Sequence, residues 1–389
     1  MARDFSILRE CRSPAAAPRA IAAIPARNEA MDVVSCLAAI GSQKFQEGSG
    51  LERSVGVVLL VNNTNDDTFD AAKAFVGSLS CAYRIYDVTM SQSTSHAGGA
   101  RRAAMDLAAA WLVESDRQDG IIFTTDADST PAQDWMATAY AAFDRGVDAV
   151  AGSICLHDAD EAALPAHVKA RGKLEARYEG LLTELFSLLD PRPHDAWPRH
   201  ATEAGANLAV TLKAYRAIGG IPVVACGEDR ALVARLESCG FLIRHDPSVR
   251  VSTSGRLKGR AAGGVADTLR LRCENVDSVC DDYLEHAWNA RFRAFWRGRL
   301  REIFARDGKD EALQAFGCRG LCLEAGDSFD DFWKALEDRD QRLRRRLIRP
   351  SQLPEEILAA TVMVKRYRRL VKPTVRIDPD DSPLFVPAE

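Results

Sequence analysis

The sequence predicts an α/β fold in which helices cover both faces of a mostly parallel sheet. Short apolar runs alternate with stretches of helical periodicity, and the loops between them are only a few residues long. One run, VGVVLLV at residues 55–61, is apolar without interruption, which is typical of a strand buried on both faces. Ligands of such sheets bind at the carboxyl ends of the strands, so we expect the polar loops there to line one crevice.

Four successive units of strand, polar loop and helix are expected in the first part of the chain. The strands are expected at residues 20–25, 55–61, 83–88 and 120–125, and the helices at about residues 29–40, 68–79, 100–113 and 131–143. A fifth strand is expected at residues 147–154, where β-branched and apolar residues cluster again.

The chain then carries a helical insertion near residues 160–195, because residues 164–189 have a helical pattern that two prolines close. The sheet is expected to resume with a strand at 205–210, helices at 212–218 and 228–238, and strands at 241–244 and 249–253. Beyond about residue 260 the periodicity is helical and the charges are blocky. We therefore expect a flexible N-terminus at residues 1–18, an α/β domain at 19–260 and an α-helical region at 261–389 with a loose end.

Composition excludes several classes of protein. The 389 residues include 51 Lys+Arg and 55 Asp+Glu, and this net charge of −4 argues against a nucleic-acid polymer as partner. The ten cysteines form no CxxC pair, so a zinc ribbon is not expected, and reduced thiols are the natural interpretation. No secretory signal or apolar stretch of membrane-spanning length is found, so we expect a cytoplasmic protein, with peripheral contact at the inner membrane surface left open.

The clearest chemical signal is the pair Asp126 and Asp128, which follows the apolar strand IIFTT. Two carboxylates separated by one residue at a strand end can face the same crevice. Hard oxygen ligands suit Mg²⁺ or Mn²⁺, especially where a diphosphate adds further oxygens. This pair therefore indicates a metal site, although Asp-x-Asp also occurs by chance in acidic loops.

Two helix starts supply further candidates. Glu228 and Asp229 open a helix, where a carboxylate can act as a general base but where acidic residues are also favoured by the helix dipole. Arg101 follows two glycines at another helix start, a pattern that suits an anion but equally a flexible turn. The chain has no GxxxxGK[ST] motif and no GxGxxG after the first strand, so the phosphate loops of kinases and dehydrogenases are absent.

In their order, these segments resemble the family 2 glycosyltransferases of the GT-A fold. The shared features are a Pro-x-x-Asn-Glu strand end, a second strand end with an Asn pair and a later Asp, a Gly-rich Ala-Arg helix start, an Asp-x-Asp loop, a Gly-x-Asn-x-Ala strand and a Glu-Asp helix. The resemblance covers residues 19–260. It implies a GT-A catalytic domain and an enzyme that uses a nucleotide-sugar donor, a metal ion and an inverting mechanism.

The resemblance also implies roles for individual residues. Donor binding would involve Pro25, Arg27, Asn28, Glu29, Asn63, Asp67, Arg101, Asp126 and Arg256. Asp126 and Asp128 would hold the metal, and Asp229 would be the base with Glu228 as its supporting neighbour. The acceptor side would be shaped by Trp135, Gly205 and Asn207.

Some features depart from the family pattern or allow two interpretations. Asn62 and Asn63 stand where many members have two Asp, and no Gln-x-x-Arg-Trp motif follows the Glu-Asp helix, so a non-processive enzyme is expected. The basic segment 252–260 could close over the diphosphate or be a linker. His245 could be a metal ligand, although a single histidine near a strand end is more often structural.

Two other functions stay open at this stage. A sugar-phosphate nucleotidyltransferase uses a related sheet, but such enzymes have a Gly-rich phosphate loop where this chain reads IPARNEA. A catalytically inactive GT-A scaffold could act through the helical tail. The partners of an active enzyme would be a nucleotide-sugar donor and a small-molecule or lipid-linked acceptor. For the tail, packing on the catalytic domain or in a homodimer is favoured over contact with a membrane.

Overall fold

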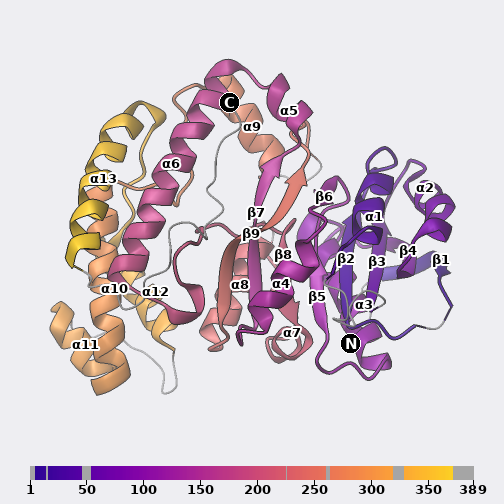
Figure 1. Cartoon of the computed structure of the whole chain (residues 1–389), viewed down its shortest axis with the longest axis horizontal. Helices are drawn as coiled ribbons and strands as arrows, with labels where there is room; N and C mark the ends of the chain where they lie inside the picture. Colours follow the sequence, from indigo (N-terminus) through magenta and orange to yellow (C-terminus); the bar gives the residue numbers. More distant parts are fainter. Residues whose placement is uncertain are drawn as a thin grey trace.

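The computed structural model describes residues 5–14, 16–45, 54–224, 226–259, 263–318 and 328–370. Figure 1 shows a sheet with helices around it and a group of helices beside its far end. The end of the predicted basic segment, at Arg260, and the Pro- and Asp-rich end of the chain lie outside the described residues.

The described strands form one nine-stranded sheet of order β1-β4-β3-β2-β5-β8-β7-β9-β6. The strands are β1 (Phe5–Arg12), β2 (Ala20–Ala26), β3 (Val55–Asn62), β4 (Ala82–Met90), β5 (Ile121–Thr124), β6 (Ser129–Pro131), β7 (Ala149–Leu156), β8 (Leu208–Thr211) and β9 (Ile243–Thr253). All eight residues of β3 are buried, as its continuous apolar run predicts.

Six of these strands run in one direction, which confirms the mostly parallel sheet. Strands β4, β3, β2 and β5 pair in parallel, with Ala23 of β2 opposite Val58 of β3 and Thr124 of β5. Strand β8 is antiparallel to both β5 and β7, and β9 again pairs in parallel with β7. The carboxyl ends of β2, β3 and β5 therefore meet at one edge of the sheet.

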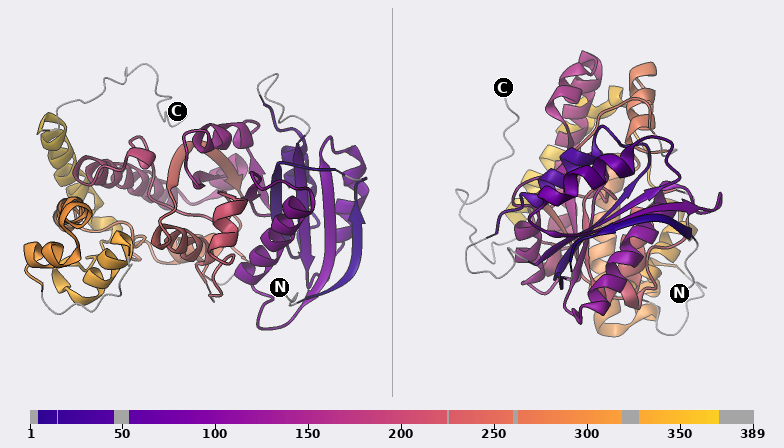
Figure 2. Two further views of the ribbon diagram at one scale, coloured as in Figure 1. Left: turned by 90° about the horizontal axis from the view of Figure 1, so that it is seen from below. Right: turned by 90° about the vertical axis from the view of Figure 1, so that its right-hand side faces the viewer.

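Helices cover both faces of the sheet, as Figure 2 shows. One face is packed by α1 (Val33–Gly41), α2 (Thr68–Phe75) and α4 (Trp135–Phe143). The other is packed by α3 (Ala97–Glu114), α7 (Leu212–Ala217) and α8 (Glu228–Ser238). Helix α8 spans the residues that the sequence predicts for it.

The remaining helices form a second body of apolar contacts. They are α5 (Asp158–Ala163), α6 (Ala166–Leu189), α9 (Val265–Glu274), α10 (Ala287–Asp307), α11 (Lys309–Phe316), α12 (Phe329–Arg339) and α13 (Leu353–Leu370), with single 3₁₀ turns at residues 76–78, 193–195, 341–343 and 350–352. Helix α6 shares one apolar cluster with α10 and α13, while α10, α11 and α12 share another. The predicted insertion thus packs against the C-terminal helices.

Several local predictions need correction. Residues 5–12 were expected to be flexible, but they form strand β1, which pairs antiparallel with β4. Arg9 of this strand donates to Asp87 at 2.7 Å and to Asp70 at 3.0 Å, and these bonds fix an edge strand with little apolar character. Residues 129–131, expected in a loop, form β6, and the two last predicted strands are one continuous strand, β9.

None of the helices within the described ranges combines the length and the apolar composition that a bilayer span requires.

A buried ionic network joins the sheet to the helical region. Asp190, which is 4% exposed, accepts hydrogen bonds from Arg301 at 2.8 and 3.1 Å and lies 3.7 Å from Arg297. Arg192 donates to Glu237 of α8 at 2.8 Å and to Asp330 of α12 at 3.3 Å. Burial would raise the pKa of Asp190, but its arginine neighbours hold that pKa below its usual range.

Replacing Asp190 by asparagine is expected to lower the free energy of unfolding by about 3–5 kcal/mol, because it leaves buried guanidinium groups without their counter-charge. Asp119→Asn removes an exposed partner of Arg19 and should change the same quantity by about 1 kcal/mol or less. Urea unfolding of the two variants measures both effects. Equal effects would contradict a structural role for the network.

Candidate active site

The polar loops at the carboxyl ends of β2 and β3 are joined by direct hydrogen bonds. Asn28, in a left-handed conformation with φ 57°, accepts bonds through Oδ1 from the Thr64 hydroxyl and the Asn65 N–H, both at 2.9 Å. The N–H of Glu29 donates to the Thr68 hydroxyl at 2.8 Å. These bonds hold the first turn in an irregular conformation, which explains why α1 begins at Val33 rather than at the predicted position.

Asp66 organises the second loop, and sequence reasoning missed it. Its carboxylate accepts bonds from the Thr64 hydroxyl at 2.8 Å, the Thr68 N–H at 3.0 Å and the Ala30 N–H at 3.2 Å. Although burial acts to raise the pKa of Asp66, these bonds lower it. The only signal in the sequence is the Asx-type spacing to the Thr68 amide, which many loops share.

The predicted donor-binding residues of these loops differ in their surroundings. The side-chain amide of Asn63 is engaged with the Met90 backbone, donating at 3.0 Å and accepting at 2.9 Å. Asp67 precedes α2 and is exposed, without a capping bond from its side chain. Pro25 is half-buried, and exposed Arg27 donates to the Ser95 carbonyl at 3.4 Å. Asn63 therefore links β3 to β4, whereas Asp67 and Arg27 face solvent.

Arg101 of α3 joins four separate segments around the end of β5. Its guanidinium donates to Asp126 at 2.7 Å, to Glu228 of α8 at 3.2 Å, to the Thr124 hydroxyl at 3.1 Å and to the Gly205 carbonyl at 2.7 Å. The residue is 4% exposed. Burial acts to lower the pKa of Arg101, but the neighbouring carboxylates raise it, so the guanidinium is charged.

Asp229 lies directly beside this cluster. Its carboxylate accepts from the Gly205 N–H at 3.0 Å and from the Arg230 N–H at 2.8 Å. Gly205 thus bonds Arg101 through its carbonyl and Asp229 through its N–H. A Cβ atom at Gly205 would lie 2.5 Å from Cζ of Arg101, so this close approach requires glycine.

The second carboxylate of the Asp-x-Asp loop pairs with a different arginine. Asp128 lies 2.7 Å from Nη2 of Arg256, and Arg256 also donates to both carboxylate oxygens of Glu29, at 2.8 and 3.1 Å. The ring of His157 lies 3.2 Å from the Asp128 carbonyl. Burial raises the pKa of Asp128 to about 6, with repulsion from Asp126 contributing and Arg256 opposing the rise.

The donor set fits Mg²⁺ or Mn²⁺ bound mainly by phosphate oxygens. Within the described part of the chain, no three or more His, Cys, Asp or Glu side chains are arranged to hold a metal ion by themselves. Asp126 and Asp128 offer only hard oxygen atoms, and the raised pKa of Asp128 reflects excess negative charge that a cation would neutralise. Mg²⁺ is often held by one or two carboxylates together with substrate phosphates.

The three residues expected on the acceptor side do not lie together at the surface. Trp135 and Asn207 are each 1% exposed, and the indole N–H of Trp135 donates to Asn207 Oδ1 at 2.8 Å. Asn207 in turn donates to the carbonyls of Ser153 at 2.7 Å and Val249 at 2.9 Å. These two side chains lie behind the site, and only Gly205 contacts its charged groups.

His245 belongs to a buried cluster that its sequence context did not reveal. Its Nδ1 lies 3.0 Å from Asp195, and its Nε2 lies 3.5 Å from Glu203. Burial alone would lower the pKa of His245, but the two carboxylates raise it to about 9. Both ring nitrogens face carboxylates, so the structure favours the structural interpretation over a metal ligand.

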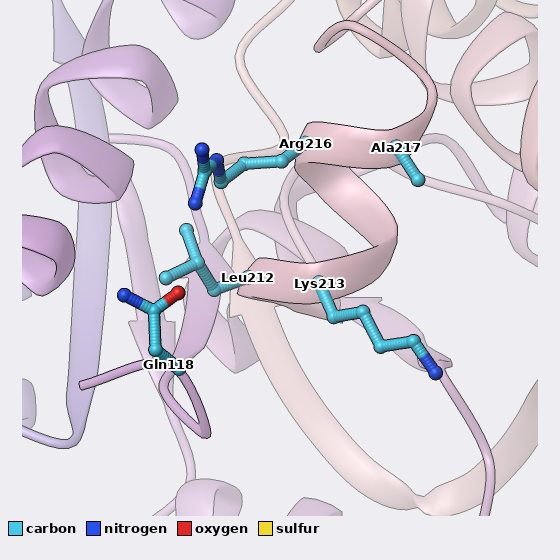
Figure 3. Close-up of a pocket in the computed structure, with 5 residues that line it drawn as sticks. All are labelled: Gln118, Leu212, Lys213, Arg216 and Ala217. Atoms are coloured by element: carbon cyan, nitrogen blue, oxygen red, sulfur yellow. The ribbon is translucent and has the colours of Figure 1, made fainter.

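A hollow of about 490 Å³ lies at the opposite edge of the sheet (Figure 3). Its lining residues are Gln118, Leu212, Lys213, Arg216 and Ala217. The Leu212 N–H donates to the carbonyl of Gly120, which precedes β5, whereas Asp126 follows β5. The hollow is therefore separate from the charged cluster and contains none of the predicted site residues.

The chain is similar to several solved structures. Over 93% of this chain and 78% of the other, it is similar to the mannosyltransferase PcManGT from Pyrobaculum calidifontis in complex with GDP-Man and Mn²⁺, with a TM-score of 0.42 and 16% identity. It is also similar to S. aureus TarS 1-349 in complex with UDP, over 93% and 94% of the two chains, with a TM-score of 0.41 and 11% identity. No family model and no curated protein sequence matches. At these scores no activity or ligand is assigned from the similarity.

The charged state of His245 predicts a pH-dependent stability. Because the pKa of His245 is higher in the folded chain than the usual 6.5, its contribution is complete below about pH 6.5 and is lost as the pH rises through about 9. Wild type should lose about 2–3 kcal/mol across this window relative to His245→Gln. Urea unfolding at several pH values measures the difference, and parallel pH profiles of the two proteins would contradict it.

Proposed function

We propose that this protein is an inverting, family 2-like glycosyltransferase that moves a sugar from a nucleotide-diphosphate donor to an acceptor hydroxyl. The observation that supports the proposal best is the connection between the Asp-x-Asp loop and the Glu-Asp helix. Arg101 bonds Asp126 and the Gly205 carbonyl, and the Gly205 N–H bonds Asp229. A donor-binding carboxylate and a candidate base are thus held by one buried arginine and one glycine.

On the donor side, Asp126 and Asp128 would hold Mg²⁺ or Mn²⁺, which would neutralise the charge of the departing nucleoside diphosphate. The first turn of α3, beside Arg101, directs backbone N–H groups and the positive end of a helix dipole toward the same region. Asn28, Glu29 and Asp67 would contact the nucleoside. Pro25, Arg27 and Asn63 would shape that pocket, Asn63 by holding β3 against β4.

On the acceptor side, Asp229 would remove the proton from the attacking hydroxyl. The oxygen forms a bond to the anomeric carbon while the bond to the diphosphate breaks, and the electron pair leaves with the diphosphate. Attack from the opposite face inverts the configuration. Two backbone N–H groups fix the direction of the Asp229 carboxylate. Glu228 would act through Arg101, and Trp135 and Asn207 would act by supporting the surrounding backbone.

Asp229→Asn is expected to reduce sugar transfer by about 10²–10⁴-fold, because the amide cannot accept the proton. Binding of UDP or GDP in the presence of Mn²⁺ should stay close to that of the wild type, because Asp229 lies on the acceptor side. Transfer is measured by release of the nucleoside diphosphate, and binding by calorimetry. An equal loss of binding and transfer would count against Asp229 as the base.

A donor screen tests the activity itself. Thermal unfolding with UDP- and GDP-sugars is expected to show stabilisation by one nucleotide class, and this stabilisation should require Mn²⁺ or Mg²⁺. Asp128→Asn should remove the metal requirement together with most of the stabilisation. Release of pyrophosphate instead of a nucleoside diphosphate would indicate a nucleotidyltransferase. A lack of stabilisation by every donor would favour the inactive scaffold.

A further inference from the structure

Arg256 makes unusual contacts for a residue beside a metal-binding carboxylate. Its guanidinium lies 2.7 Å from Asp128, 2.8 and 3.1 Å from the two oxygens of Glu29, and 3.9 Å from Asp32. Among the described residues, all of its side-chain partners are carboxylates. An arginine held in this way acts as a cation that neutralises an acidic cluster.

The two arginines of the site are held very differently. Arg101 extends from a long helix, is 4% exposed and also bonds a neutral hydroxyl and a backbone carbonyl. The Arg256 side chain is 27% exposed and follows the end of β9. Displacing Arg101 would leave its charge buried, whereas Arg256 can turn toward solvent or toward a bound anion.

The backbone before Arg256 is fixed, so an exchange needs little movement. The Gly255 N–H donates to Asp160 of α5 at 2.7 Å, and the Thr253 carbonyl accepts from the His157 N–H at 2.9 Å. These bonds attach the end of β9 to the segment that begins α5. Movement can therefore be limited to the long Arg256 side chain and the residues that follow it.

We propose that Arg256 is an exchangeable counter-ion. In the free protein it occupies the carboxylates of Asp128 and Glu29. A divalent cation bound to Asp128 needs the same carboxylate and repels the guanidinium, so it displaces Arg256. The displaced guanidinium then pairs with the donor diphosphate, whose oxygens match its fork of donors. This inference rests on the proposed function and adds to it a coupling between metal binding and donor binding.

The exchange predicts effects of opposite sign from one substitution. Arg256→Gln is expected to bind Mn²⁺ at least about tenfold more tightly than the wild type in the absence of nucleotide, because the competing charge is gone. In saturating Mn²⁺ the same variant should bind UDP or GDP more weakly by about fivefold or more, because it lacks the fork. Electron paramagnetic resonance of free Mn²⁺ measures the first quantity, and calorimetry measures the second.

Two further variants keep the test decisive. Arg256→Lys should tighten Mn²⁺ binding less than the glutamine variant, because one ammonium group cannot hold Glu29 and Asp128 together. Arg19→Gln removes the same charge at the opposite edge of the sheet, where Arg19 pairs with Asp119. It should leave Mn²⁺ binding unchanged, and an effect as large as that of Arg256→Gln would overturn the inference.

The exchange and the proposed function fail in distinguishable ways. If Asp128→Asn abolishes Mn²⁺ binding but Arg256→Gln leaves it unchanged, Arg256 does not compete with the metal and the exchange is wrong. If Asp128→Asn itself leaves Mn²⁺ binding unchanged, the metal assignment of the proposed function is wrong, and the exchange falls with it.

Discussion

The buried guanidinium of Arg101 is the interaction on which the candidate site depends. A charge in the protein interior is tolerated only when it is paired and hydrogen-bonded, and Arg101 meets both conditions through Asp126 and Glu228. Its partners come from segments that are more than a hundred residues apart along the chain. The requirement to pair one charge therefore fixes how the Asp-x-Asp loop, the Gly205 loop and the start of α8 lie relative to one another.

Excess negative charge at the other side of the loop follows from this arrangement. Once Arg101 is committed to Asp126 and Glu228, Asp128 and Glu29 depend on Arg256, and neighbouring carboxylates with burial still raise the pKa of Asp128. The site thus combines a rigid ion pair with an adjustable one. This combination suits the binding and release of a charged ligand, because the rigid part keeps the geometry while the adjustable part adapts its charge.

The sequence predicted the features that depend on local patterns. Continuous apolar runs predicted β3, helical periodicity predicted α8, and the position of Asp126 and Asp128 after a strand predicted where they lie. Features that depend on distant partners were not predictable. Nothing near His245 indicates that Asp195 and Glu203 would face its two nitrogens. Strand β1 was missed because its charged residues resemble a solvated tail until Asp87 is brought beside Arg9.

The helical region also bears on the position of the candidate base. Helix α8 begins with Glu228 and Asp229 at the site and ends near Glu237, which Arg192 bonds within the network that includes Asp330 of α12. Because a helix transmits a displacement along its axis, the contact of α8 with the C-terminal helices helps to set where Asp229 points. The boundary at residue 260 stays a prediction, since α6, which precedes it, shares an apolar cluster with α10 and α13. A region without site residues can therefore control the geometry of the acceptor side.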